Sequence, residues 1–418
     1  MDNTLSFALR QDRQDELKEF RSQFHFPETG GKARVYLCGN SLGLQPKGAA
    51  AKVERVLESW KTNALDGYMH GEAPWMTYGE RFKKPLCALT GSLPHEVSVM
   101  NTLTVNLHLL LCSFYRPTER RYKILVEAGA FPSDQYATDT QVQHHGLDPR
   151  EAIVEIGPRV GEKLIREEDL LTAIRDVGPN LALVLIGGVN YYTGQFFDLA
   201  KLTAAAHAVG ALAGYDLAHA VGNVPLRLHD WGVDFATWCN YKYLNGGPGA
   251  AGAIYIHERY SLDPAVPRLA GWSGSELKTR FQMPRTFIPE PGTDGWALTL
   301  AQGLVLGGLD ASLELFEQAG LERLRAKSIR LTGYLEYLLG LLPADTFEII
   351  TPRPEASRGA QLSIWFPSGG APLQTALSDA GIVVDYRQPG VIRVSPAPLY
   401  NSFEDVYHFC EALRAALP

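Results

Sequence analysis

Short apolar runs alternate with amphipathic stretches between about residues 53 and 310 of the chain. In the clearest unit, the apolar run LALVLIGGV is followed by the helical pattern DLAKLTAAAHAVG and then by a second apolar run, ALAGYD. Strands that alternate with helices in this way are typical of a parallel sheet whose two faces are both covered. We therefore expect an α/β fold with a large, mainly parallel sheet flanked by helices.

The pattern changes at both ends of the chain. The first residues are mostly polar and helical in pattern, and they lead into YLCGNSLGLQPK, a stretch rich in turn residues. Toward the C-terminus, one long helix around ASLELFEQAGLERLRAKSIRLTGYLEYLLGLL precedes the strand-like runs QLSIWFPS, GIVVDYRQ and VIRVSP and a last helix, EDVYHFCEALRAAL. We expect an N-terminal arm (1–50) that contributes to the small domain and the active site, a large domain (51–310) and a smaller α+β domain (311–418).

Composition narrows the possible function classes. The 418 residues are 45% hydrophobic and 20% charged, as in a globular protein long enough for two domains. A formal net charge of -7 provides no basic field for nucleic acid or anionic lipid, and no apolar segment has the uninterrupted length of a membrane span. The five cysteines lack CxxC spacing, so we expect no disulfide framework, no metal site and a location in the reducing cytoplasm.

Asp216 and Lys242 form the first candidate site. Asp216 closes the run ALAGYD, and Lys242 closes DFATWCNYK, which we expect to be another strand, so neighbouring strands bring both side chains to one edge of the sheet. Pyridoxal phosphate (PLP) needs this pair, because the amine forms a Schiff base with the cofactor and the carboxylate keeps the pyridine nitrogen protonated. Taken alone, however, such a pair is more often a structural ion pair between strands.

The sequence around this pair, DLAHAVGNVPLRLHDWGVDFATWCNYKYLNGGPGAAGAIYI, resembles the kynureninase family of fold-type-I PLP enzymes, which are similar to class V aminotransferases. The similarity extends from about Tyr36 to the C-terminus. It implies the fold-type-I transferase architecture, with PLP held by Lys242 in the large domain. It also implies hydrolysis of L-kynurenine or 3-hydroxy-L-kynurenine to L-alanine and anthranilate or 3-hydroxyanthranilate, in tryptophan catabolism and NAD biosynthesis.

Two further motifs suit a phosphate and a flat ring. In NTLTVNLHLLL, Leu103 and Thr104 open an apolar helix whose free N–H groups suit a phosphate, although the same residues also fit an ordinary N-cap. In FPSD, the ring of Phe131 can stack on the cofactor and Asp134 can accept a hydrogen bond. The resemblance assigns to the cofactor Leu103, Thr104, Phe131, Pro132, Ser133, Asp134, Asp216, His219, Tyr241, Lys242, Trp272 and Thr293.

The resemblance also implies the catalytic residues and the assembly. Lys242 is expected to act as general base and Tyr241 as proton donor. Trp272 and Thr293 resemble positions that reach the phosphate from the neighbouring subunit, which implies a homodimer with shared active sites. Arg393, on VIRVSP, is expected to bind the substrate α-carboxylate with its planar fork of donors. Further substrate-binding candidates are Asn40, Ser41 and His70.

Some positions depart from the family pattern, and other functions remain open. Gly187 replaces a serine of some relatives, Ser273 stands where an aromatic residue is common, and Thr293 stands where animal relatives carry asparagine. These changes leave open the choice between kynurenine and 3-hydroxykynurenine. The nearest alternative is a cysteine desulfurase or another class V aminotransferase-type enzyme, but a desulfurase needs a cysteine on a late loop and residues 343 to 395 contain none. A cofactor-free Schiff-base aldolase or a noncatalytic binding protein is a more distant alternative.

Overall fold

A seven-stranded sheet forms the centre of the larger part of the protein. The computed structural model describes residues 1–417. The strand order is β4-β10-β9-β8-β7-β5-β6, and β9, β8, β7, β5 and β6 run parallel, whereas β10 is antiparallel to both of its neighbours. The expected large, mainly parallel sheet is therefore confirmed. Its strands are β4 (Val97–Val99), β5 (Lys123–Glu127), β6 (Ile153–Ile156), β7 (Leu181–Gly187), β8 (Leu212–Asp216), β9 (Phe235–Trp238) and β10 (Ala253–Ile256).

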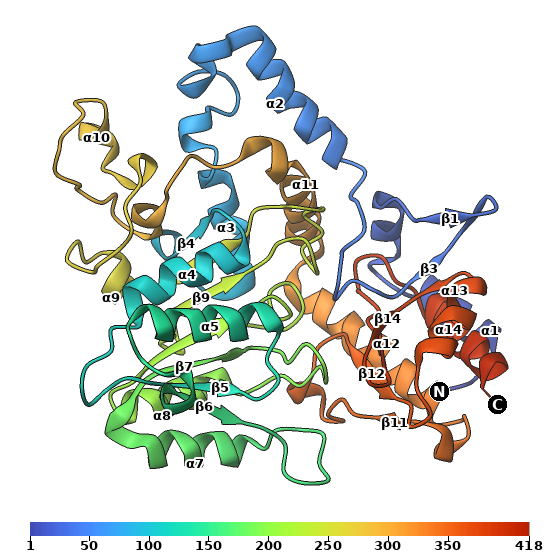
Figure 1. The fold of residues 1–418 in the computed structure, drawn as a ribbon. Helices are drawn as coiled ribbons and strands as arrows, with labels where there is room; N and C mark the ends of the chain where they lie inside the picture. The colour runs from blue at the N-terminus through green and yellow to red at the C-terminus, as the bar shows by residue number, and fades with distance from the viewer. Residues whose placement is uncertain (418) are drawn as a thin grey trace.

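Helices cover both faces of this sheet, and Figure 1 shows α4 and α5 on one side of it and α7 and α8 on the other. Along β7, Leu183 and Leu185 pack toward α4 and α5, while Val184 and Ile186 pack toward α7 and α8. Both side-chain sets of the strand are thus buried, which explains its unbroken apolar run. The helices of this part are α2 (Ala49–Asn63), α3 (Glu80–Thr90), α4 (Leu103–Phe114), α5 (Pro132–His144), α6 (Pro149–Ala152), α7 (Glu167–Val177), α8 (Leu199–Ala208), α9 (Glu258–Ser261), α10 (Leu277–Arg280) and α11 (Gly303–Ala319).

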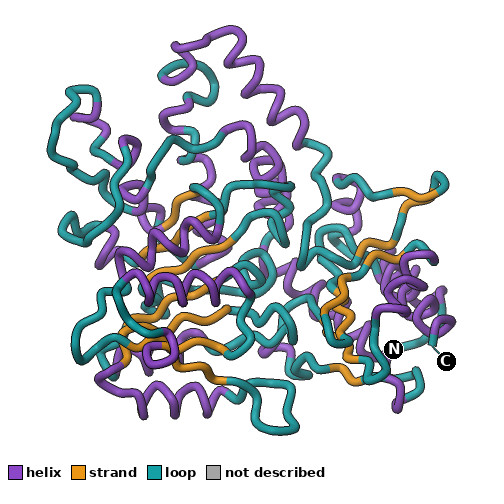
Figure 2. The backbone as a smooth tube through the Cα atoms, viewed as in Figure 1, coloured by secondary structure: helices purple, strands orange, loops and turns teal. Residues whose placement is uncertain are grey.

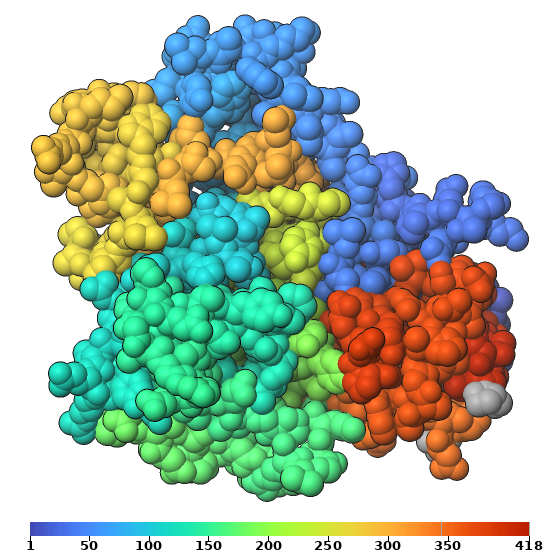
Figure 3. Space-filling view, in the orientation of Figure 1, coloured from blue at the N-terminus to red at the C-terminus, as the bar shows by residue number. Residues whose placement is uncertain are grey.

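A second, antiparallel sheet lies in the C-terminal part of the chain, in the order β11-β12-β15-β14. Figure 2 shows these short strands set apart from the strands of the large sheet, and Figure 3 shows the C-terminal residues gathered in one lobe beside the N-terminal arm. This smaller sheet has its own apolar core, to which α12, α14 and the arm contribute. Its elements are α12 (Leu321–Leu339), β11 (Glu348–Ile349), β12 (Leu362–Trp365), α13 (Ala371–Asp379), β14 (Asp385–Arg387), β15 (Val391–Val394) and α14 (Phe403–Ala416).

The N-terminal arm packs against the smaller sheet. It contains α1 (Leu5–Arg13), the hairpin of β1 (Glu28–Thr29) and β2 (Lys32–Ala33), and β3 (Val35–Tyr36). Strand β3 pairs in parallel with β13 (Ile382–Val383), so residues from the two ends of the chain form one ladder. Because Ala8 of α1 is buried in the apolar core of the smaller sheet, the arm is an integral part of that lobe.

Two elements differ from the sequence expectation. The single long helix expected after residue 310 is two helices, α11 and α12, because Gly320 between them has φ 76°, outside the helical region. The strand expected to run up to Lys242 ends at Trp238. Beyond it, Asn240 donates its side-chain amide to the Ala251 carbonyl and accepts Gly246 N–H at its own carbonyl, which replaces ladder pairing by a turn.

The described helices include none that combines the length and the hydropathy needed to cross a membrane.

A buried ion pair fastens the arm to α12. The Lys327 ammonium lies 2.7 Å from the Asp15 carboxylate, and each side chain is 4% exposed. Burial lowers the pKa of Lys327, and the nearby Asp15 carboxylate opposes that shift. Each charge therefore depends on the other for compensation.

We expect Lys327→Met to destabilise the protein by about 3–5 kcal/mol, because it leaves a buried carboxylate without its cation. The double variant Asp15→Leu/Lys327→Met should recover most of that loss, since neither charge is then buried. Urea unfolding at pH 7 measures both effects. Lys201→Met is the matched control, because the ammonium of Lys201 pairs with carboxylates at the surface. A single variant as stable as the parent would show that the pair contributes nothing.

Candidate active site

One cavity of about 200 Å³ opens at the carboxyl edge of the large sheet. Glu127, Gly187 and Asp216, which end β5, β7 and β8, all line it. Ligands of open α/β sheets bind at this edge, because the strands end there and are followed by loops with free polar groups. The other lining residues come from the starts of α4 and α5 and from loops: Leu103, Thr104, Phe131, Ser133, Asp134, Val189, Tyr191, Ala218, His219, Tyr241 and Lys242.

Lys242 is the amine of this cavity. Its Nζ lies 2.9 Å from His219 Nε2 and 5.7 Å from the centre of the Phe131 ring. Burial and the Lys242 charge lower the pKa of His219 well below its usual range, so the imidazole is neutral and its Nε2 accepts a hydrogen bond from the ammonium. The other ring nitrogen, Nδ1, is buried without a hydrogen-bond partner among residues 1–417.

The loop that carries Lys242 is held by the N-terminal arm. Gly43 N–H donates to the Tyr241 carbonyl at 2.8 Å. A side chain at this glycine would overlap the Lys242 carbonyl and Asn245. The lysine position therefore requires glycine in the arm, which explains the turn-rich stretch CGNSLG.

Three carboxyl groups share the cavity with this one lysine. Asp216 Oδ1 accepts a hydrogen bond from Ala218 N–H at 2.7 Å. Burial and the neighbouring Asp216 carboxylate raise the pKa of Asp134 well above its usual range. Burial raises the pKa of Glu127 to about 7. A ring nitrogen that carries a proton would supply the hydrogen-bond donor and the positive charge that this end of the cavity lacks.

Another part of the cavity lining suits an anion. Leu103 and Thr104 form the first turn of α4, whose N-cap residue, Thr102, makes no side-chain capping bond. The first N–H groups of a helix have no partner within the helix, and the helix dipole favours negative charge there. Together with the amine, the acidic end and the Phe131 ring, these groups fit pyridoxal phosphate.

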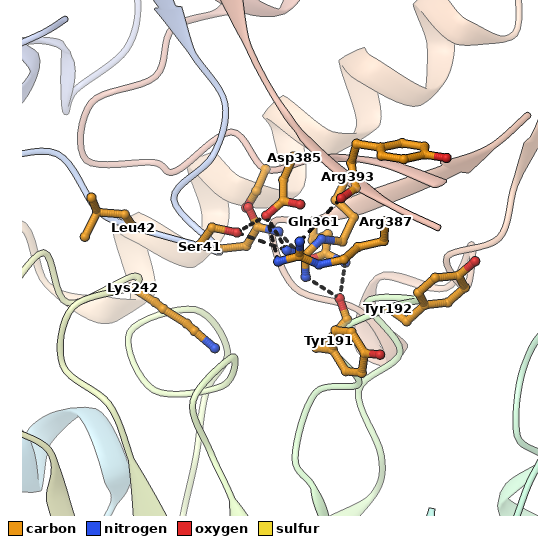
Figure 4. Close-up of polar contacts among 12 residues, drawn as sticks. Ser41, Leu42, Tyr191, Tyr192, Lys242, Gln361, Asp385, Arg387 and Arg393 are labelled. Atoms are coloured by element: carbon orange, nitrogen blue, oxygen red, sulfur yellow. Dashed lines mark hydrogen bonds and ion pairs between the residues drawn. The ribbon is translucent and has the colours of Figure 1, made fainter. Parts of the chain in front are cut away.

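A second cluster lies beside the cavity and centres on Arg393 (Figure 4). Arg393 is 1% exposed; its Nη2 donates to Asp385 Oδ2 at 2.5 Å and its Nη1 to the Tyr191 carbonyl at 2.7 Å. Arg387 donates to the same Asp385 oxygen at 3.2 Å. Two guanidinium groups thus face one carboxylate, which leaves one positive charge for an anionic ligand.

Two arm residues reach this second cluster. The Ser41 hydroxyl donates to Asp385 and accepts from Arg393 Nη2 at 2.9 Å. Asn40 is fully buried, and its side-chain N–H donates to Gln361 at 3.0 Å. Its side-chain oxygen has no hydrogen-bond partner in the described chain. Figure 4 shows the Lys242 side chain extending into the space between its own loop and the turn of Tyr191, below the arginine cluster.

The structure brings together most, but not all, of the residues singled out in the sequence. The cavity and the adjoining cluster contain Asn40, Ser41, Leu103, Thr104, Phe131, Ser133, Asp134, Asp216, His219, Tyr241, Lys242 and Arg393. Pro132 starts α5 next to the cavity without lining it. His70 is solvent-exposed and lies outside the cavity.

Trp272 and Thr293 also lie outside the cavity of their own chain. Trp272 is 44% exposed and its ring meets the edge of Phe281. Thr293 is buried, and its hydroxyl lies 2.7 Å from the Ser98 hydroxyl.

Sequence reasoning missed several residues of the site. Glu127 ends β5 with a carboxylate, just as Asp216 ends β8. The signal that predicted Asp216 could therefore also have predicted Glu127. Tyr191 acts through its backbone carbonyl, and Asp385 and Arg387 lie near Arg393 because β14 pairs with β15. No spacing rule of a single sequence indicates such contacts.

Comparison with known proteins agrees with this geometry. A family model described as "Kynureninase C-terminal domain" matches residues 324–413. The chain is 54% identical over 410 residues to the kynureninase of Myxococcus xanthus (strain DK1622), an alignment that covers 98% of this chain and 96% of that protein. It is 50% identical over 418 residues to the kynureninase of Flavobacterium psychrophilum, with 99% and 98% covered.

Solved structures show the same fold at much lower identity. A C-DES mutant with glycine covalently linked to its PLP cofactor superposes with a TM-score of 0.78 at 18% identity, and covers 94% of this chain and 98% of that chain. The cysteine desulfurase CsdA from Escherichia coli gives a TM-score of 0.76 at 19% identity, with 96% and 98% covered. These similarities confirm the expected fold-type-I architecture and carry no information on substrate. The full-length identities of about half, in contrast, confirm the resemblance found in the sequence, and the chain belongs to the kynureninase family.

Proposed function

We propose that this protein is a PLP-dependent enzyme that hydrolyses L-kynurenine, 3-hydroxy-L-kynurenine or both to L-alanine and the matching anthranilate, in the cytoplasm, as a step of tryptophan catabolism. The observation that carries the proposal is that, in a member of the kynureninase family, Lys242 and the Asp216 carboxylate line one cavity and the buried Arg393 lies beside it, hydrogen-bonded to the carbonyl of a lining residue. The reaction consumes one water and breaks the bond between Cβ and Cγ of the substrate.

When bound, PLP supplies an electron-accepting ring that stabilises negative charge on the substrate carbon next to the amine. Asp216, at the end of β8, would accept a hydrogen bond from the protonated ring nitrogen and so keep the ring positively charged. Lys242 would hold the cofactor covalently at rest. When its amine is free, Lys242 would act as the general base that takes the proton from the substrate Cα.

Tyr241 is the proposed proton donor to Cβ of the fragment that becomes alanine. Burial and the nearby Cys239 raise the pKa of the Tyr241 phenol, so that it stays protonated at neutral pH. A protonated hydroxyl next to Lys242 can deliver a proton to Cβ after the aryl group has left. His219, neutral and bonded to Lys242, orients the amine.

Arg393 is the proposed anchor for the substrate α-carboxylate. Its guanidinium is held by Asp385, Ser41 and the Tyr191 carbonyl, so little side-chain freedom is lost when a carboxylate binds. Asn40, with its unpaired carbonyl oxygen, lies beside this anchor. We assign His70 a contact with the aryl end of the substrate in the complete assembly.

We also propose that the active protein is a homodimer in which Trp272 and Thr293 reach the phosphate of the partner's cofactor. Both residues lie away from the cavity of their own chain, as this arrangement requires. Large apolar side chains are exposed on α2 and around α10, where an interface would cover them, among them Trp60, Phe281 and Met283.

The first prediction concerns the reaction itself. Cofactor-loaded protein, incubated separately with L-kynurenine and 3-hydroxy-L-kynurenine, should release alanine together with the matching anthranilate, as measured by mass spectrometry. Lys242→Ala should abolish the release, because the amine is lost. A yellow, lysine-bound cofactor without any alanine from either substrate would leave the fold intact and refute the reaction.

The second prediction concerns the carboxylate anchor. Arg393→Lys keeps the charge but loses the planar fork, and we expect KM to rise about 100-fold, with a smaller fall in kcat. Arg387→Lys, whose arginine is bonded to Asp385 at the rim of the cluster, is the matched control, with KM changed about threefold or less. Steady-state kinetics decide, and equal KM values for both variants would place the anchor elsewhere.

The third prediction concerns shared active sites. Hybrid dimers that pair a Lys242→Ala chain with a Trp272→Ala chain contain one site with both residues intact if each chain completes its partner's site. Co-expression with two different affinity tags allows the hybrid to be isolated. At limiting PLP we expect the hybrids to have about half of the activity of the unchanged protein. The Lys242→Ala homodimer and the Trp272→Ala homodimer should each have almost none. Hybrids no more active than the Trp272→Ala homodimer would show that sites are not shared.

A further inference from the structure

Glu127 occupies a position that neither the sequence motifs nor the mechanism above uses. It ends β5, is 3% exposed and lines the cavity of Lys242. Its carboxyl group accepts hydrogen bonds from Gly187 N–H at 3.1 Å and from Asn190 Nδ2 at 2.8 Å. One oxygen thus holds the end of β7, and the other holds the turn that follows it.

Asn190 extends these hydrogen bonds into the turn. Its side-chain oxygen accepts from the N–H groups of Tyr192 at 3.0 Å and Thr193 at 2.9 Å, and from the Thr193 hydroxyl at 3.0 Å. The peptide between these anchors carries the Tyr191 carbonyl, which accepts from Arg393 Nη1 at 2.7 Å. A continuous set of hydrogen bonds therefore runs from Glu127 in the cofactor cavity to the arginine of the carboxylate site.

Gly187 gives the Glu127 carboxyl its room. A Cβ atom at residue 187 would lie 2.8 Å from Glu127 Oε1, closer than carbon and oxygen normally approach. Glycine at residue 187 therefore allows the carboxyl to lie directly against the strand backbone.

We propose that Glu127 is a positioning residue that couples the cofactor cavity to the substrate carboxylate site, by holding through Asn190 the turn whose Tyr191 carbonyl orients Arg393. The proposal rests on the proposed function, because it takes Arg393 as the substrate anchor. Glu127 touches neither the substrate carboxylate nor Arg393, so its removal acts on how well the anchor is placed.

The charge state of Glu127 should control how firmly the turn that carries the Tyr191 carbonyl is fixed. Burial raises its pKa to about 7, and the two N–H donors oppose that shift because they favour the carboxylate. The titratable groups that line the same cavity are Asp134, Tyr191, Asp216, His219, Tyr241 and Lys242, and Asp216 raises the pKa further. On the neighbouring strand, Glu127 is paired with the apolar Ile156.

As the pH falls through about 7, Glu127 gains a proton, and one of its oxygens becomes a poorer partner for an N–H donor. The turn is then held less firmly, and Arg393 loses part of its fixed geometry. We therefore expect KM for kynurenine to rise about tenfold between about pH 8 and pH 6, with kcat changed by less than about threefold from this cause.

Glu127→Gln tests the coupling. An amide places an NH2 group against one of the two N–H donors at every pH, so KM should be raised about tenfold at about pH 8 and should lose the rise toward acid pH that the parent shows. Other groups that titrate in this range act equally on both proteins, so the difference between the two profiles isolates Glu127. Glu155→Gln, which makes the same change at an exposed carboxylate on β6, is the matched control and should follow the parent.

Binding gives a measurement that needs no turnover. L-Alanine carries the same carboxylate, and its binding to the holoenzyme can be followed by the absorbance of the cofactor. We expect its Kd to rise about tenfold in Glu127→Gln and in Asn190→Ala, which breaks the same connection one step later, while the Kd of PLP changes less than about threefold. Asn190→Ala also tests the proposal if Glu127→Gln fails to fold.

The outcomes separate the two proposals. Identical KM profiles and alanine affinities for the parent and both variants would overturn the role of Glu127 while kynurenine cleavage stands. Weakened PLP binding with unchanged alanine affinity would also overturn it, since Glu127 would then act on the cofactor alone. A parent protein that cleaves neither kynurenine would instead overturn the proposed function.

Discussion

Compensation of charge at the carboxyl edge of the large sheet is the constraint on which the site depends. Three acidic side chains meet there in a largely buried space, with the ammonium of Lys242 as the cation among the lining residues. Burying carboxylates is unfavourable unless protons, donors or cations accompany them. Two of these carboxyls, Asp134 and Glu127, have a raised pKa as a result. A positively charged ring would compensate these carboxyl groups, so the electrostatics of the cavity favour such a ligand.

The second half of the site is assembled from distant parts of the chain. Arg393 comes from β15, its carbonyl partner from the turn after β7, and Ser41 from the N-terminal arm. Neither lobe alone can therefore bind a substrate that has its amine at Lys242 and its carboxylate at Arg393. The lobes also meet away from this cluster, where the Thr351 hydroxyl donates to the Thr193 carbonyl and Ala360 N–H donates to the Asn223 side-chain oxygen.

Much of this could be predicted from one sequence, and the reasons are specific. The buried run of β7 and the helices beside it have strong periodicity, and Asp216, Lys242 and the motifs around them follow strand ends, where ligands bind. The break at Gly320 was missed because the apolar pattern continues through it. The end of β9 was misplaced because one side-chain and one backbone hydrogen bond of Asn240, which no pattern encodes, fix a turn beyond Trp238. The network around Tyr191 and Asp385 depends on tertiary contacts alone.

The pairing of β3 with β13 has a consequence for how the protein is made. Val35 and Tyr36 leave the ribosome long before their partners, Ile382 and Val383. Closing so long a loop is slow, and the arm has no ladder partner until residues 382 and 383 have been synthesised. The arm, which supports Lys242 through Gly43, can therefore form this ladder only after the strands of the large sheet have been synthesised. A nascent chain that stops before residue 382 lacks the ladder that ties the arm to the smaller lobe.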